Sequence, residues 1–94
     1  MTRASLPTRR AADEIVFEHG NRLWRVAFGR FPDGRPAELF LDGGSVDPLS
    51  ELAKESAIVA SLALQSGCPF ETLRHALDGR DAGPIGTALA LIEG

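Results

Sequence analysis

The side chains of this chain that could do chemistry are mainly arginines in its first third. Residues 1–36 hold seven arginines against four acids, a net charge of +3, whereas residues 37–94 have a net charge of −6. Several positive charges close together are the first requirement for binding a phosphate backbone. They also suit head-to-tail contact between basic and acidic surfaces. A third interpretation is that these charges are simply solvated. The candidate partner-binding residues are Arg22, Arg25, Arg30 and Arg35.

The remaining polar residues show no arrangement typical of a catalytic site. Cys68 is the one cysteine, so neither an intramolecular disulfide nor a multi-cysteine zinc site can form. It precedes Pro69, at the predicted start of a helix whose dipole favours anions, but no serine or cysteine has a recognisable base partner. His19 is expected to be solvated in a turn, and no spacing offers three or four metal ligands. We therefore predict no catalytic residue, no cofactor and no metal site.

Size and composition favour one small domain in a reducing cytoplasm. The chain has 94 residues, of which 44% are hydrophobic, as is usual for a globular domain. Residues 1–12 lack a core-facing pattern, which predicts a flexible basic arm before a single domain over residues 13–94. No signal peptide is recognisable, and the longest uncharged apolar run, residues 57–64, is far shorter than the roughly 20 residues that span a bilayer.

Alternating apolar residues predict the strands that would position the arginines. The predicted strands are residues 15–17, 22–31 and 37–41. In the second strand Trp24 shares one face with apolar neighbours, and Arg25 lies on the other face. Residues 19–21 and 32–34 have the composition of tight turns, because glycine accepts positive φ and proline presets the first corner. The pattern therefore predicts a three-stranded antiparallel β-meander.

Helix signals follow the strands and complete an α+β fold. The predicted helices are one long helix over residues 47–66 and two short ones that begin at Pro69 and Pro84. Asp47 is a typical N-cap, and Gly67 is a typical left-handed helix end. Residues 57–64 are apolar on every face, so we expect the sheet to cover one side and later helices or another subunit to cover the rest. Ile58 and Leu62 are the candidate core or dimer positions.

Two stretches of the chain carry a pattern that resembles a known family. Residues 34–41 are Gly-Arg-Pro-Ala-Glu-Leu-Phe-Leu, and residues 61–69 are Ser-Leu-Ala-Leu-Gln-Ser-Gly-Cys-Pro. The first is similar to a Gly-Arg-Pro strand of the TSCPD domain, and the second to its helix end followed by a second helix. This module is found at the C-terminal end of adenosylcobalamin-dependent ribonucleotide reductases and as short standalone proteins. The resemblance covers roughly residues 22–92.

One departure from the family limits what the resemblance implies. The family is named after a Thr-Ser-Cys-Pro-Asp stretch near its end, and residues 83–87 of this chain, Gly-Pro-Ile-Gly-Thr, stand at that position. Ile85 replaces the cysteine, and Cys68 lies elsewhere, at the turn between two helices. Reductase chemistry needs several cysteines, a radical generator and a large barrel. The resemblance therefore implies an accessory module and not a reductase.

These observations predict a non-enzymatic protein-interaction domain that forms a homodimer. The family resemblance makes a ribonucleotide reductase-related protein the first partner to consider. The alternative is a nucleic-acid-binding module that uses the basic N-terminal half of the chain. A sequence pI of about 5.3 and the absence of tyrosine weigh against that alternative, because nucleic-acid binders are commonly basic and stack bases on aromatic rings.

Overall fold

Three antiparallel strands form one sheet in a computed structural model that describes residues 13–78 and 82–92. The elements are β1 (Asp13–His19), β2 (Arg22–Arg30), β3 (Pro36–Asp42), α1 (Pro48–Gln65), α2 (Phe70–Ala76) and α3 (Pro84–Leu91). The strand order β1-β2-β3 follows the chain, so the predicted α+β fold with a β-meander, one long helix and two short helices is confirmed. The predicted arm, residues 1–12, lies outside the described residues.

Both hairpins of the meander have local causes. Gly20 and Asn21 join β1 to β2 with positive φ angles of 61° and 59°, the pair of left-handed residues that suits a two-residue hairpin turn. Between β2 and β3, the Gly34 amide donates to the Phe31 carbonyl over 2.9 Å, and Gly34 again has a positive φ. Because each turn reverses the chain within a few residues, neighbouring strands in the sequence are neighbours in the sheet.

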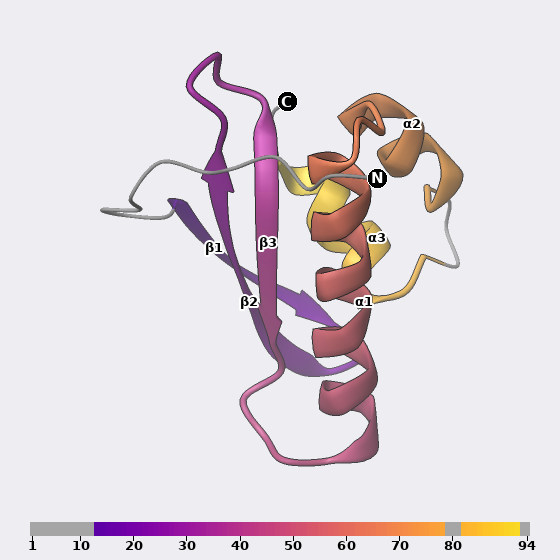
Figure 1. Ribbon diagram of the computed structural model, residues 1–94. Helices are drawn as coiled ribbons and strands as arrows, with labels where there is room; N and C mark the ends of the chain where they lie inside the picture. The colour runs from indigo at the N-terminus through magenta and orange to yellow at the C-terminus, as the bar shows by residue number, and fades with distance from the viewer. Residues whose placement is uncertain (1–12, 79–81, 93–94) are drawn as a thin grey trace.

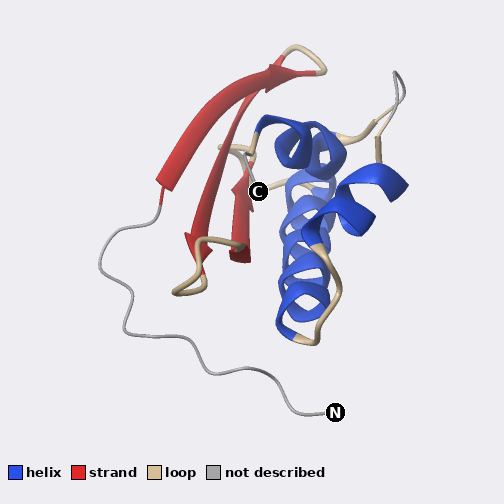
Figure 2. Cartoon of the chain, turned by 90° about the horizontal axis from the view of Figure 1, so that it is seen from above, coloured by secondary structure: helices blue, strands red, loops and turns tan. Residues whose placement is uncertain are grey.

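All three helices cover one face of the sheet, as Figure 1 and Figure 2 show. The strand residues buried on this face are Phe17, Trp24, Val26, Phe28, Leu39 and Leu41. Their helical partners in the core include Ala57, Ala60 and Leu64 of α1, and Leu89 of α3. No described element covers the opposite face, where Val16, Leu23 and Phe40 are exposed. The molecule therefore has two layers and one bare sheet face.

The long helix α1 begins and ends at the residues that the sequence indicates. The Asp47 carboxylate accepts a hydrogen bond from the Ser50 amide over 2.9 Å, which caps the first turn. At the other end Gly67 has a φ of 100°, and the Cys68 amide donates to the Ala63 carbonyl over 2.9 Å. This left-handed ending reverses the chain toward α2. Between its caps α1 lies along β3 (Figure 1).

The two short helices complete the core beside α1, with α3 packed against β1. Phe70 of α2 and Leu89 of α3 are buried, as is Ile92, which follows α3. His19 at the end of β1 donates a hydrogen bond from Nε2 to the Ala82 carbonyl over 2.8 Å. The prediction that His19 is a solvated turn residue is therefore wrong, because the chain entering α3 packs over the end of β1. This bond ties the end of β1 to the loop that leads into α3.

Candidate functional site

The four candidate arginines do not form one surface. Arg25 lies on the bare sheet face, Arg22 reaches the start of α1, and Arg30 and Arg35 flank the β2–β3 hairpin. Each makes an ion pair within the chain, namely Arg22 with Asp47 (2.9 Å), Arg25 with Glu14 (3.3 Å), Arg30 with Asp13 (3.4 Å) and Arg35 with Asp33 (2.7 Å). The positive charge of these four arginines is therefore offset side chain by side chain.

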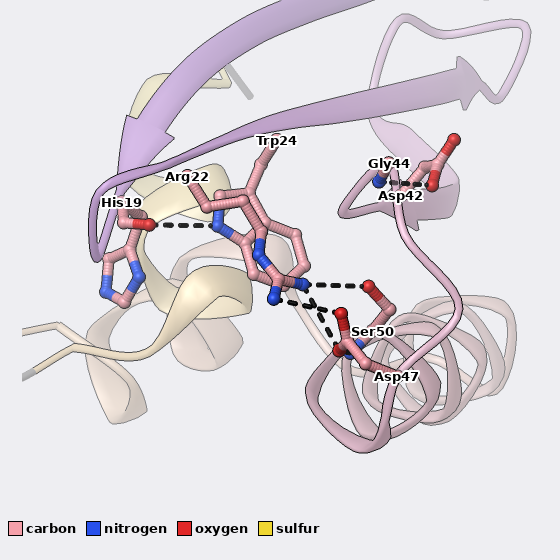
Figure 3. A network of polar contacts seen from close by, with 7 residues as sticks. All are labelled: His19, Arg22, Trp24, Asp42, Gly44, Asp47 and Ser50. Atoms are coloured by element: carbon pink, nitrogen blue, oxygen red, sulfur yellow. Dashed lines mark hydrogen bonds and ion pairs between the residues drawn. The ribbon is translucent and has the colours of Figure 1, made fainter.

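Arg22 belongs to a polar network that joins the first hairpin to α1 (Figure 3). Its Nη1 donates to Oδ1 of Asp47 (3.2 Å) and to the Ser50 hydroxyl (3.0 Å), while its Nη2 makes the 2.9 Å ion pair with Oδ2 of Asp47. The guanidinium also lies 5.4 Å from the centre of the Trp24 ring. The Trp24 indole in turn donates to the His19 carbonyl over 3.1 Å. The network fixes the start of α1 against the sheet, so Arg22 positions an element of the fold, and its role in binding a partner stays a prediction.

Two contacts hold the pKa of Asp47 below its usual value of 3.8. The larger cause is the hydrogen bond from the Ser50 amide, and the Arg22 guanidinium adds to it. Both contacts favour the charged carboxylate and exist only in the folded protein. A carboxyl group whose pKa falls on folding contributes stability that is present above its unfolded pKa and is lost as the pH falls through its folded pKa.

We expect Asp47→Asn to be less stable than the wild type near pH 6, and to approach it as the pH falls below about 4. Asparagine can still cap α1 but carries no charge for Arg22, so the variant loses only the charged contribution. Urea unfolding of both proteins from about pH 6 to pH 2 measures the difference in their free energies of unfolding. A difference that does not change with pH would show that the Asp47 charge adds nothing to stability.

Two polar side chains of α1, Ser61 and Gln65, bond to the free edge of β3 at Leu39 and Ala37. The Ser61 hydroxyl accepts a hydrogen bond from the Leu39 amide (2.8 Å), lies 3.2 Å from the Leu39 carbonyl, and donates to the Ala57 carbonyl (2.8 Å). Gln65 donates from Nε2 to the Ala37 carbonyl over 2.9 Å. Ser61 and Gln65 are both buried. They satisfy backbone groups that an edge strand would otherwise present to another chain.

Beyond this covered part, an open groove of about 330 Å³ lies between β3 and α1. Its lining residues are Leu39, Phe40, Leu41, Asp42, Lys54 and Ile58. Most of this lining is apolar, and Phe40 is exposed at the border of the bare sheet face. The groove is continuous with the outward face of α1 because Ile58 belongs to both.

An exposed apolar stripe runs along the outward face of α1. We define this α1 stripe as Leu52, Ile58, Val59 and Leu62. Ile58 is 57% exposed and Leu62 is 43% exposed, so the prediction that they are core residues of one chain is wrong. The reason is that α1 turns its small residues, with Leu64, Ser61 and Gln65, toward the sheet. The helices that follow do not cover the stripe within the described ranges, and the dimer role of both residues stays a prediction.

No protein-family model, curated protein or solved structure matches this chain. The likeness to the TSCPD domain therefore stands on the two sequence stretches alone, and the family stays a hypothesis.

The remaining candidates for chemistry lie apart from the groove. Cys68 is partly exposed at the α1–α2 turn, and its sulfur lies 3.5 Å from the Pro69 carbonyl. Ile85, at the position of the family's cysteine, packs against the core. Residues 13–78 and 82–92 contain no group of three or more histidine, cysteine or acidic residues placed to hold a metal ion. In the same ranges, no helix has the length and apolar content needed to cross a membrane.

Sequence reasoning missed three residues that shape this surface, namely Phe40, Ser61 and Gln65. Ser61 and Gln65 left a usable signal. They are polar, four residues apart and set in an otherwise apolar stretch, so they mark one side of the helix. Phe40 left a weaker signal, because an aromatic residue between Leu39 and Leu41 breaks the expected alternation of apolar and polar residues.

Proposed function

We propose that this chain is a non-enzymatic protein-interaction domain that works as a homodimer. The observation that supports it best is the α1 stripe, whose four large apolar side chains are exposed on one helix face beside the groove. Large apolar side chains grouped on one exposed helix face, here around Glu55, are typical of an interaction site on a small protein. A chain of 94 residues also buries a modest share of its own surface, so an interface would add apolar burial that the monomer lacks.

The nucleic-acid alternative has less support. Phosphate binding draws on several positive charges that converge on one track, but the four candidate arginines occupy different parts of the fold and each has an acidic neighbour. Exposed ion pairs are weak, so Arg25 and Arg35 could exchange partners. Their acids would still lie beside the phosphates and repel them. The balance of charge therefore favours a protein partner.

The resemblance to the TSCPD domain supports a more specific partner. In that family the module lies at the C-terminal end of adenosylcobalamin-dependent ribonucleotide reductases or forms a short standalone protein. A ribonucleotide reductase-related protein is accordingly the first heterologous partner to test, in addition to self-association.

We expect the purified chain to have a mass in solution of twice the 10.0 kDa of one chain, and Ile58→Glu to weaken the dimer by at least about 100-fold in Kd. The substitution occurs twice in a symmetric pair, and each buried carboxylate costs at least about 1.4 kcal/mol, a factor of ten in Kd. Size exclusion with light scattering over a micromolar concentration series measures both masses.

Val46→Glu is the matched control, because it introduces the same charge at a side chain that is 95% exposed in the loop before α1. It should leave the mass at that of a dimer. Circular dichroism should show that both variants stay folded, since Ile58 contributes little to the monomer core. A wild-type mass equal to that of a single chain at every concentration would rule out the homodimer.

A further inference from the structure

Two copies of this chain could associate by joining their sheets or by packing their helices, and the structure disfavours joining the sheets at β3. A second copy that extended the sheet beyond β3 would hydrogen-bond to the backbone groups at the free edge of this strand. Ser61 and Gln65 already bond to those groups at Leu39 and Ala37. A partner strand would have to displace α1 from β3, where the helix makes its main contact with the sheet.

The other edge of the sheet, β1, is protected by charge. Glu14 and Glu18 lie on either side of Val16 on the same face of this strand. Two copies paired in antiparallel fashion about Val16 would set Glu14 opposite Glu18, and like charges directly opposite each other destabilise a strand pair. Neither edge of the sheet therefore suits a second copy. The bare sheet face also exposes apolar side chains, but Glu14, Glu18 and Arg25 stand among them. Residues 56–65 of α1 carry no charge, so the α1 stripe is the more apolar of the two remaining surfaces.

Charge along α1 selects one orientation for the second copy. All its charged residues, Glu51, Lys54 and Glu55, lie in its first half, and residues 56–65 carry none. In a parallel pair the glutamates of the two copies would lie side by side and repel each other. In an antiparallel pair each acidic half faces an uncharged half, and the two helix dipoles also oppose each other favourably.

We propose that a second copy of this chain packs on the α1 stripe with the two α1 helices antiparallel about a two-fold axis that crosses the stripe midway between Leu52 and Leu62, at the level of residue 57 along the helix. This inference rests on the proposed homodimer and specifies its interface. Leu52 and Leu62 are the two ends of the stripe and are equally far from Ala57 in the sequence. An antiparallel pair centred there places Leu52 of each copy beside Leu62 of the other. Such a two-fold contact is self-complementary and closes after two subunits.

Cysteine cross-linking tests the orientation directly. In a Cys68→Ser background, Leu52→Cys and Leu62→Cys are made as separate proteins, each treated alone or after mixing with a short bis-maleimide. We expect the mixture to form a covalent dimer, and each variant alone to form at least about tenfold less. The two positions lie about 15 Å apart along one helix, at about 1.5 Å per residue, so in an antiparallel pair identical positions are too far apart.

The possible outcomes separate this inference from the proposed function. Efficient cross-linking of each variant with itself, in a protein with the mass of a dimer, would mean a parallel pair and would overturn the antiparallel arrangement alone. A dimeric protein that cross-links in neither way would place the interface away from α1 and would also overturn it. A monomer mass for the Cys68→Ser background would remove the homodimer and this inference together. Val46→Cys, exposed outside the stripe, serves as the control for random collision.

Discussion

Trp24→Ala is expected to lower the free energy of unfolding by about 3–5 kcal/mol, the largest effect of any single substitution considered for this chain. Trp24 is 1% exposed and lies in the middle of the core. Its removal leaves a large cavity between the sheet and the helices, takes the donor from the His19 carbonyl, and removes the ring beside Arg22. Domains of this size are stable by roughly 5–15 kcal/mol. Urea unfolding measures the loss.

Leu23→Ala is the matched control, one residue away on the same strand. Leu23 is 65% exposed on the bare sheet face, so its truncation should change stability by less than about 0.5 kcal/mol. Trp24→Phe keeps a ring but not the indole donor, so its loss of stability should lie between those of Trp24→Ala and Leu23→Ala. It replaces Trp24→Ala in the comparison if the alanine variant does not fold. Equal losses of stability for Trp24→Ala and Leu23→Ala would contradict the assignment of the core to the sheet face that the helices cover.

Ser61→Ala is expected to cost about 1–3 kcal/mol, because it leaves the buried Leu39 amide without its acceptor. The change removes a single oxygen and creates almost no cavity, so the loss reports the hydrogen bonds and not the packing. It also uncovers part of the β3 edge. Urea unfolding gives the free energy, and amide hydrogen exchange at Leu39 should become faster in the variant.

Ser56→Ala is the control for this substitution on the same helix. The Ser56 hydroxyl donates to the Ala53 carbonyl within α1, so its loss should change the stability by less than about 0.5 kcal/mol and leave the exchange of Leu39 unchanged. If Ser61→Ala had equally little effect, the edge of β3 would not depend on α1. Pairing of two β3 strands would then compete with the α1 stripe as the dimer contact.

The sequence alone determined the elements of this fold, because their signals are local. Gly20 and Asn21 favour positive φ wherever they occur, Asp47 caps the helix that starts next to it, and Gly67 ends the same helix. Tight turns between successive strands then leave the meander as the simplest sheet. The strand and helix order was predictable for this reason, and so was the core face that contains Trp24.

The tertiary structure decided which side of α1 is covered and where the arginine charges go. An apolar stretch such as residues 57–64 has the same local pattern whichever face packs on the sheet. The choice came from Ser61 and Gln65, whose polar groups gain partners only against the edge of β3, and this turned Ile58 and Leu62 outward. Arg35 pairs with Asp33 only two residues away, but Arg22, Arg25 and Arg30 met their acids through the strand register or a loop between elements. Such pairings depend on distances in space, which the order of residues along the chain does not contain.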